Sequence, residues 1–197
     1  MNDTIKDIPL FPLSSVILPG GRLPMQLFEP RYIDMLTRCL KEPCGFVIVL
    51  LSKGGEAGGQ AQFHDVGTYV NIVDFQQLDN GLLGITVEGD RKVRVLRNWQ
   101  QNDQLHVGDV EYLPSEAPAE IPTHLRELSS VLKALSRHPV IKDLGMNIDF
   151  HDARSVGWRL TELLPLEVHQ KQHLLELQNP LERLENLQAL LEVLDGS

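Results

Sequence analysis

Several features that would assign a chemistry are missing from this 197-residue chain. It has only two cysteines, Cys39 and Cys44, and no second pair to complete a four-ligand zinc site, so we expect reduced structural cysteines. No Gly-x4-Gly-Lys-Ser/Thr loop and no Gly-x-Ser-x-Gly turn occurs. These absences exclude a conventional P-loop motor and a hydrolase with a nucleophile elbow.

Signals for membrane insertion and export are also lacking. No apolar run approaches the roughly 18–20 residues that cross a bilayer. Residues 1–7 do not show the basic and then apolar order of a secretory signal. We therefore expect a cytoplasmic protein with no membrane partner.

Positive charge is scarce. Eighteen Lys and Arg stand against 27 Asp and Glu, for a formal net charge of −9. A broad positive field for phosphate binding is therefore not expected, and nucleic acid is a disfavoured partner. Four basic residues do cluster, namely Arg91, Lys92, Arg94 and Arg97, and we expect them to form an exposed strand face that pairs with acids such as Asp90.

The hydrophobic pattern changes at residues 114–120, where two prolines indicate a connector. Before it, apolar runs predict strands at 45–51, 66–75, 82–87, 92–96 and 105–113, with a flexible loop at Ser52–Gln62 and a turn at Asp79–Gly81. After it, leucines at three- and four-residue steps predict helices at 125–135, from an Asp149 cap to 163, after Pro165, and from an Asn179 cap to 194. The chain is thus predicted to be α+β, with a β-rich half at residues 1–118 and a helical bundle at 119–197.

Residues 8–32 are the most informative segment. Five prolines interrupt its short apolar runs, which excludes a long helix and favours brief strands joined by sharp corners. The prolines are Pro9, Pro12, Pro19, Pro24 and Pro30. The last one follows Glu29 and precedes Arg31-Tyr32, so it is expected at the first position of a helix near 30–41.

This segment resembles the start of the substrate-binding N-terminal domain of Lon-type ATP-dependent proteases, where P-L-F-P-L, V-x-x-P-G and L-P-L-x-I-F-E-x-R-Y follow in order. The corresponding residues here are Pro9–Leu13, Val16, Pro19-Gly20, Leu23-Pro24-Met25, Leu27-Phe28-Glu29 and Arg31-Tyr32. Weaker matches follow at Val66-Gly67-Thr68, Asp79–Gly81, Val87-Glu88-Gly89 and Val93-Arg94-Val95. Lys92 stands where the family has an arginine, so a bidentate ion pair is not expected there.

The resemblance extends over about residues 7–194 and implies a PUA-like β-barrel followed by helices. It also implies a function in recognition without hydrolysis, because the motor and the serine–lysine peptidase of Lon belong to other domains. The expected protein is a non-catalytic module with no cofactor and no metal. It would bind unfolded or exposed polypeptide segments, or a partner protein, and a homo-oligomer would give avidity.

Two groups of residues are candidates for roles in such a module. Those for peptide binding are Met25, Leu27, Phe28, Arg31 and Tyr32. Those that shape the motif are Pro19, Gly20, Pro24, Glu29, Pro30, Gly67, Gly89 and Arg94. From the sequence, Met25, Leu27 and Phe28 can line an apolar groove or belong to the core. Arg31 can bind Glu29 or a backbone carbonyl.

Three alternatives stay open at this stage. One is a small-ligand sensor or an enzyme with a pocket between barrel and helices, since a fold alone does not fix a function. A second is an RNA-binding PUA-like protein that uses the basic cluster. A third, a metal site at His169, His173 and Glu176, is disfavoured because His169 and His173 are expected on a solvated helix face.

Overall fold

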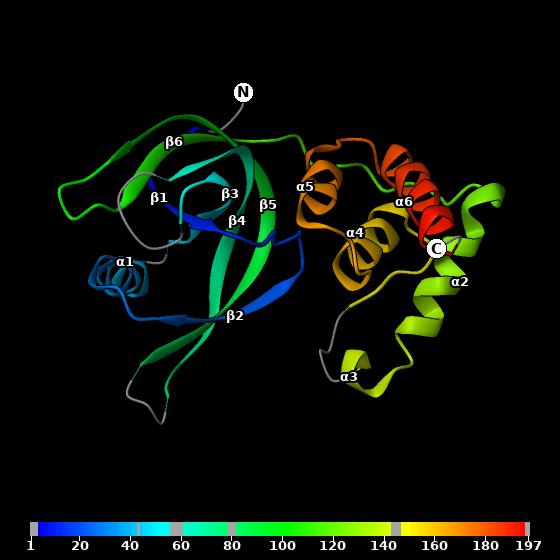
Figure 1. The fold of residues 1–197 in the computed structure, drawn as a ribbon, viewed down its shortest axis with the longest axis horizontal. Helices are drawn as coiled ribbons and strands as arrows, with labels where there is room; N and C mark the ends of the chain where they lie inside the picture. The colour runs from blue at the N-terminus through cyan, green and yellow to red at the C-terminus, as the bar shows by residue number, and fades with distance from the viewer. Residues whose placement is uncertain (1–3, 43, 56–60, 79–81, 143–146, 196–197) are drawn as a thin grey trace. The chain divides into compact units, whose positions relative to one another are not determined.

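The computed structural model describes residues 4–42, 44–55, 61–78, 82–142 and 147–195. The expected turn at Asp79–Gly81 and residues 56–60 of the expected loop at Ser52–Gln62 lie outside the described residues, while Ser52, Lys53 and Gln62 at the ends of that loop belong to strands. Contacts divide the chain into two compact units, Met1–Pro114 and Ser115–Ser197 (Figure 1). The boundary between these units lies within residues 114–120, the connector expected from the sequence.

The first unit is built on six strands. They are β1 (Thr4–Leu13), β2 (Arg22–Leu27), β3 (Phe46–Lys53), β4 (Gln62–Gln77), β5 (Leu83–Gln100) and β6 (His106–Tyr112). The strand order is β2-β5-β4-β3-β1-β6, and β5 also pairs with β6. Strands β5, β4, β3, β1 and β6 therefore pair in succession, and β6 pairs back with β5. Among the described strands, β2 pairs only with β5. The pairing of β1 with β3 is parallel, and the other pairings are antiparallel.

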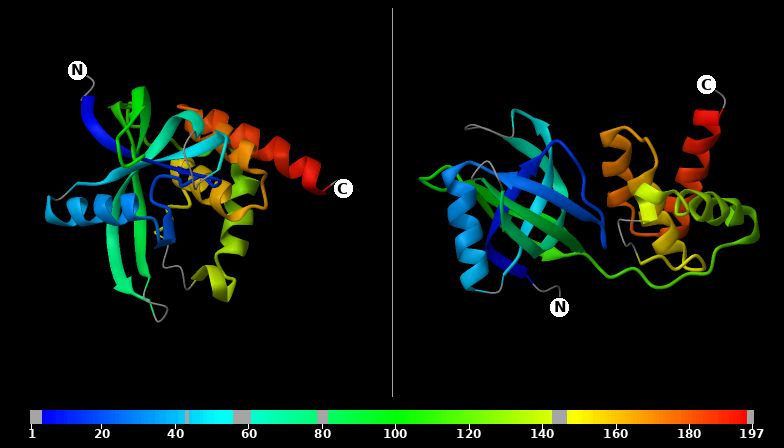
Figure 2. Two further views of the ribbon diagram at one scale, coloured as in Figure 1. Left: turned by 60° about the vertical axis from the view of Figure 1, so that its left-hand side comes forward. Right: turned by 90° about the horizontal axis from the view of Figure 1, so that it is seen from below.

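Strand β5 corrects the expectation of two separate strands at 82–87 and 92–96. It runs without interruption and is long enough to pair with β4, β2 and β6. Gly89 and Asp90 do not end it, because the register with β4 shifts by a bulge at this point. The hairpin of β4 and β5 extends past α1 (Pro30–Lys41) at one end of the unit (Figures 1 and 2).

Helix α1 supplies one side of the core of the first unit. It begins with Pro30 at its first turn, as the sequence predicts, and Glu29 is its N-cap residue. Its inward residues recur at helical spacing and pack against Phe46 and the strands; they are Tyr32, Met35, Leu36 and Cys39. Cys39 and Cys44 are both free thiols, and only Cys44 is exposed.

The second unit consists of helices. They are η1 (Thr123–Leu125), α2 (Arg126–Leu135), α3 (Pro139–Lys142), α4 (Ala153–Leu163), α5 (Val168–Glu176) and α6 (Pro180–Asp195). Their buried leucines form one cluster around Leu132, Leu160 and Leu184. Helix α6 begins as predicted, with the Leu181 N–H donating to Asn179 Oδ1 at 3.0 Å.

Helix α4 differs from its expected start at Asp149. Asp152 is the N-cap, and its side chain accepts a hydrogen bond from the Arg154 N–H at 2.9 Å. Asp152 is favoured at the cap because its segment is tied to the connector: the Ala153 N–H donates to the Ala119 carbonyl, and Glu120 forms a β-bridge with Asp152. The sequence shows two aspartates near one helix start and cannot show this tie.

Candidate peptide-binding groove

An apolar groove lies between the end of β1 and the edge strand β2. Its volume is about 290 Å³. Residues from β1 and the segment after it form one wall, and those of β2 and the start of α1 form the other; they are Phe11, Leu13, Ser15, Leu23, Pro24, Met25, Gln26, Leu27, Phe28, Glu29 and Tyr32. The groove thus joins most of the sequence motif into one surface feature.

Strand β2 lies at an edge of the sheet, because it pairs only with β5 among the described strands. Its residues pair with β5 from Arg22 opposite Glu88 to Leu27 opposite Leu83. Burial alternates along β2, so that Leu23, Met25 and Leu27 face the core while the residues between them face outward. Pro24 lies in the middle of this strand, which suits an edge position because proline has no N–H to donate.

The five residues expected to bind peptide separate into two groups. Leu27 is 1 % exposed and Tyr32 is 4 % exposed, so both belong to the core. Phe28, by contrast, is 64 % exposed at the end of the groove, and Met25 is half-buried. Leu27 is the last residue of β2 and packs in the core, whereas Phe28 lies just beyond the end of the strand.

Arg31 stabilises the floor of the groove. Its side chain is buried, donates through Nη1 to the Gln104 carbonyl at 2.7 Å, and forms an ion pair through Nη2 with Glu29 at 2.9 Å. The guanidinium also lies 4.7 Å from the centroid of the Tyr32 ring. Tyr32 in turn stacks on Phe11 with ring centroids 4.0 Å apart. Arg31 therefore binds both partners that the sequence left open, and it faces the protein rather than the groove.

The motif glycines permit a close approach between the loop before β2 and strand β5. Gly20 has a φ of 72°, a conformation that other residues adopt at a cost, and its N–H donates to the Gly89 carbonyl at 2.7 Å. The Gly89 N–H returns a hydrogen bond to Gly21, and a Cβ on Gly89 would overlap the Leu18 carbonyl. Pro19, half-buried, precedes this turn. Gly67 lies in β4, opposite Val49 and Val93.

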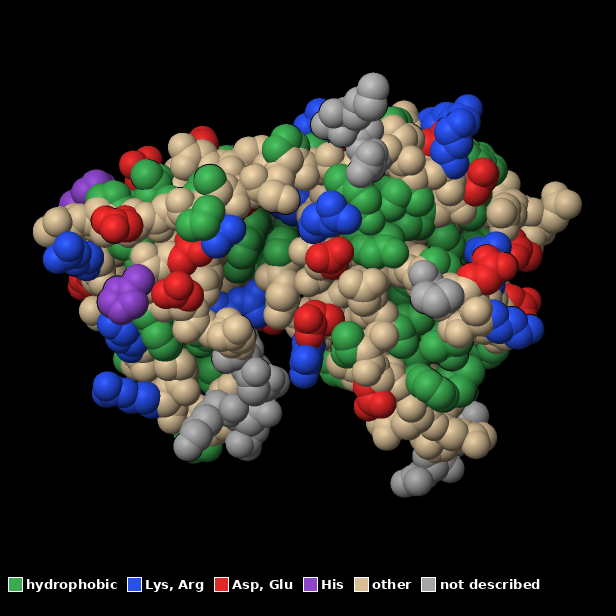
Figure 3. Space-filling view, turned by 180° about the vertical axis from the view of Figure 1, so that it is seen from behind, with side chains coloured by type: hydrophobic (Ala, Val, Ile, Leu, Met, Phe, Trp, Pro, Cys, Tyr) green, Lys and Arg blue, Asp and Glu red, His purple; other side chains and the backbone are tan. Residues whose placement is uncertain are grey.

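A second hollow on the sheet was not anticipated from the sequence. It has a volume of about 310 Å³ and is lined by β2, β4 and β5, including Met25 and Phe75. Phe75 is 58 % exposed and is paired across β4 and β5 with Ile85, which also pairs with Met25. The sequence feature that could have indicated this hollow is Phe75, an isolated phenylalanine between the polar residues Asp74 and Gln76. Figure 3 shows hydrophobic side chains scattered between charged ones over one face of the molecule.

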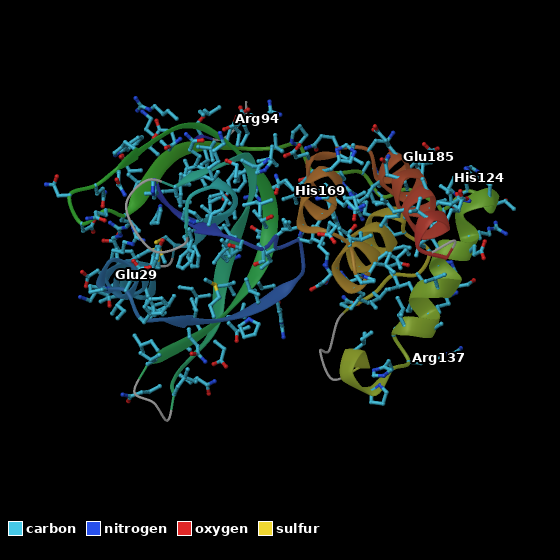
Figure 4. All side chains as sticks on the ribbon, in the orientation of Figure 1. Glu29, Arg94, His124, Arg137, His169 and Glu185 are labelled. Atoms are coloured by element: carbon cyan, nitrogen blue, oxygen red, sulfur yellow. The ribbon has the colours of Figure 1, made fainter. Side chains whose placement is uncertain are left out.

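Most of the basic cluster is the exposed strand face, paired with local acids, that the sequence predicts, and Arg91 pairs with Asp90 at 3.6 Å. Lys92 is the exception, because its side chain is buried and it is only 5 % exposed. Arg97 pairs with Asp109 at 2.6 Å, and Arg91 lies 3.6 Å from the centroid of the Tyr112 ring. Arg94 is exposed on β5, far from Glu29 in Figure 4. Burial and neutralisation together leave little free positive charge for phosphate contacts.

No group of three or more His, Cys, Asp or Glu side chains within the described residues is placed to hold a metal ion. His169 and His173 are both exposed on α5 (Figure 4). Across the described helices, none is both long and apolar enough to span a bilayer.

Comparison with known proteins identifies the family. A family model described as the ATP-dependent protease La (LON) substrate-binding domain matches residues 7–193. The chain belongs to the Lon substrate-binding domain family. Among solved structures, a Lon N-terminal domain protein from Xanthomonas campestris is 34 % identical, with a TM-score of 0.80, and the match covers 94 % of this chain and 98 % of that one. The N-terminal domain of Lon protease from the Mycobacterium avium complex, 18 % identical with a TM-score of 0.64, shares the fold over 92 % of this chain and 96 % of its own.

Curated relatives are longer than this chain. Lon protease of Escherichia coli K12 is 23 % identical over 194 residues, which is 94 % of this chain and 24 % of that protein. Lon protease of Buchnera aphidicola from Acyrthosiphon pisum is 21 % identical over 193 residues, again 94 % of this chain and 25 % of the relative. The chain therefore spans about a quarter of the length of these relatives, and the matched part is the substrate-binding domain.

Proposed function

We propose that this chain is a non-catalytic module that binds unfolded or exposed polypeptide segments in the groove beside β2. The observation that carries the proposal is the position of that groove: an unpaired strand edge and an apolar hollow of about 290 Å³ lie together, with Phe28 exposed at one end. Membership of the Lon substrate-binding domain family supports polypeptide as the ligand class.

The free edge of β2 offers main-chain hydrogen bonds to an added strand. In an antiparallel pair, successive residues direct their N–H and C=O groups alternately toward the partner and away from it. Pro24 has no N–H to donate to β5, so we infer that it stands at a position that points away from β5. Arg22 and Gln26 lie two residues before and after Pro24, so we infer that their main-chain N–H and C=O groups also point to the free side. An extended polypeptide laid along this side would bind them without regard to its own sequence.

Side chains of the added strand supply the selectivity. Every second one would point into the groove, where Phe11, Leu23 and Met25 offer apolar surface. Apolar and aromatic side chains are therefore preferred, as in segments that a folded protein keeps in its core. Because the groove is small, one contact is weak, and several copies of the module would bind a long unfolded chain through avidity.

The remaining parts of the proposal concern the fold and the setting. The succession of pairings that returns to β5 supports a PUA-like barrel at residues 1–118, and the leucine cluster of α2, α4 and α6 supports a helical bundle at 119–197. A non-enzymatic role fits a family match confined to the substrate-binding domain of Lon. We place the module in the cytoplasm, where unfolded polypeptides arise during synthesis.

Fluorescence anisotropy tests the proposal. The probe is a labelled protein that has been reduced and carboxymethylated so that it cannot refold, titrated with the full chain. We expect saturable binding that the same protein in its folded form does not show, and a loss of at least about fivefold in affinity for Phe28→Ser, since an exposed aromatic anchor often dominates such a site. Leu40→Ser is the matched control, because Leu40 is 45 % exposed on α1 and lines neither hollow. Equal binding of folded and unfolded probe, or equal loss in both variants, would overturn the proposal.

A further inference from the structure

The second unit contains a larger cavity that the proposed function does not use. Its volume is about 640 Å³, within the usual range of ligand sites. It lies beside α2, and its lining combines apolar, hydroxyl and charged side chains; they are Glu120, Ile121, Arg126, Ser129, Ser130, Lys133, Phe150 and His151. In Figure 4 the labelled residues His124 and Arg137 mark the two ends of α2.

Two cations at this cavity have no acidic partner among the residues that the structure describes. Arg126 and Lys133 are exposed on α2, seven positions apart, and both line the cavity. Neither forms an ion pair with any carboxylate in the described part of the chain; the contact of Lys133 is with the Phe150 ring, 5.5 Å from its centroid. The nearby acid Asp152 is engaged by Arg154 at 2.5 Å. In a chain of net charge −9, this is a local site for a negative group.

The walls of the cavity are held in place by the surrounding structure. The buried Ser129 hydroxyl donates to the Phe150 carbonyl at 2.8 Å and fixes that residue against α2. Opposite it, the β-bridge of Glu120 with Asp152 and the burial of Ile121 fix the connector. A ligand would therefore meet a formed site and would lose little affinity to ordering of the protein.

The chemistry of the walls selects the class of ligand. Arg126 and Lys133 fit a carboxylate, and Arg in particular binds carboxylates through two parallel hydrogen bonds. Phe150, which is half-buried, offers apolar surface that a bare inorganic anion would leave uncovered. Glu120 is an acceptor for a main-chain N–H and would repel a polyanion. A peptide with a carboxylate next to an apolar side chain offers a negative charge to the two cations, an apolar group to Phe150 and a main-chain N–H to Glu120.

We propose that this cavity binds an acidic peptide segment in which a carboxylate stands next to an apolar side chain. The site is separate from the groove beside β2 and belongs to the other unit of the chain. A polypeptide held in the groove by apolar residues can thus be recognised at a second site by its acidic residues, which adds selectivity that the main chain does not give.

NMR titration of the ¹⁵N-labelled full chain tests this site. The probe is the peptide acetyl-Ala-Phe-Glu-amide, and its Gln analogue lacks only the charge. We expect saturable shifts at the Ser129, Ser130 and His151 amides, with binding about tenfold weaker for the Gln analogue and for the double variant Arg126→Gln/Lys133→Gln, because two exposed ion pairs are lost. Arg137→Gln removes a positive charge just after α2, outside the cavity, and should bind like the parent chain.

Three results would overturn the proposal: equal shifts with both peptides, unchanged binding in the double variant, or equally strong shifts with inorganic phosphate alone, which would indicate a bare-anion site. Both substituted residues are exposed, so the variants should fold, and an unchanged Trp158 indole signal would verify this. Phe28→Ser should leave these shifts unaltered, so failure here and failure of the groove proposal are distinguishable.

Discussion

Glu116 and Arg183 form a buried ion pair that should dominate the stability of the second unit. The Arg183 side chain is 0 % exposed and that of Glu116 is 5 % exposed. Both guanidinium Nη atoms donate to the Glu116 carboxylate, at 2.9 and 2.6 Å. The guanidinium also stacks 3.3 Å from the centroid of the Trp158 ring. Burial lowers the pKa of Arg183 below its ordinary value, and Glu116 opposes this shift.

Removal of one partner should be far more costly than replacement of both. Glu116→Ala leaves a buried cation without its carboxylate, for which about 3–5 kcal/mol of unfolding free energy is expected to be lost. In Arg183→Met/Glu116→Leu no buried charge is left. Its main loss is then the pair of hydrogen bonds from Arg183 to the carbonyls of Leu174 and Leu177 at the end of α5. We expect this double variant to lose about 1–3 kcal/mol, less than the single variant.

Trp158 provides the assay because it contacts Arg183 and lies in the second unit. Urea unfolding followed by tryptophan fluorescence in a Trp99→Phe background reports this unit alone, since the chain has two tryptophans. Glu182→Ala on α6 is a control that removes an acidic residue without touching the pair. A cost below about 1 kcal/mol for Glu116→Ala, or a double variant less stable than the single one, would refute the reasoning.

Three further predictions concern the first unit. Burial, and then Arg31, hold the pKa of His106 below its usual 6.5, so the unfolded chain takes up the proton first as the pH falls. Stability should therefore fall as the pH drops below 6.5, and thermal melts of His106→Leu should show a shallower decline. Gly89→Ala should lose about 1–3 kcal/mol in urea unfolding, because its Cβ would overlap a carbonyl oxygen of the neighbouring turn, and an unchanged midpoint would contradict this contact. Burial first, and then Cys44, raises the pKa of Cys39 to about 12, so Ellman's reagent should titrate the exposed Cys44 quickly in the native protein and Cys39 only in denaturant.

Local signals in the sequence predicted the helix starts well where one residue decides them. Pro30 at the first turn of α1 and Asn179 before α6 are such positions, because their backbone preferences act within a few residues. The same reasoning failed for α4, where Asp149 and Asp152 are equally good caps. The choice of Asp152 depends on hydrogen bonds with Ala119, far away in the chain.

The strand register was beyond the reach of the sequence for a similar reason. Gly89 and Asp90 have the composition of a turn, yet a bulge opposite β4 lets β5 continue through them. Long-range pairing, and not local preference, decides this case. Lys92 was expected on an exposed face because it alternates with Val93 and Val95, and the structure buries it.

The candidate site stays a prediction, although its segment can be compared with the structure. The motif indicated the segment 25–32, and the structure places a groove there. Leu27 is buried at the end of β2 and Phe28, just past the strand, is exposed, a distinction that needs the position at which β2 ends. Phe75 carries no motif and comes beside Met25 only through strand pairing. The proposed second site depends on the fold even more, because its lining combines residues of the connector with residues of α2.

Amide hydrogen exchange on the full chain, with and without the carboxymethylated unfolded protein, tests the central claim most directly. If an extended segment adds to the free edge of β2, the Arg22 and Gln26 amides should exchange more slowly in the complex, and Phe28→Ser should abolish the effect. Saturated binding that leaves these two amides unchanged would contradict recognition by strand addition at β2.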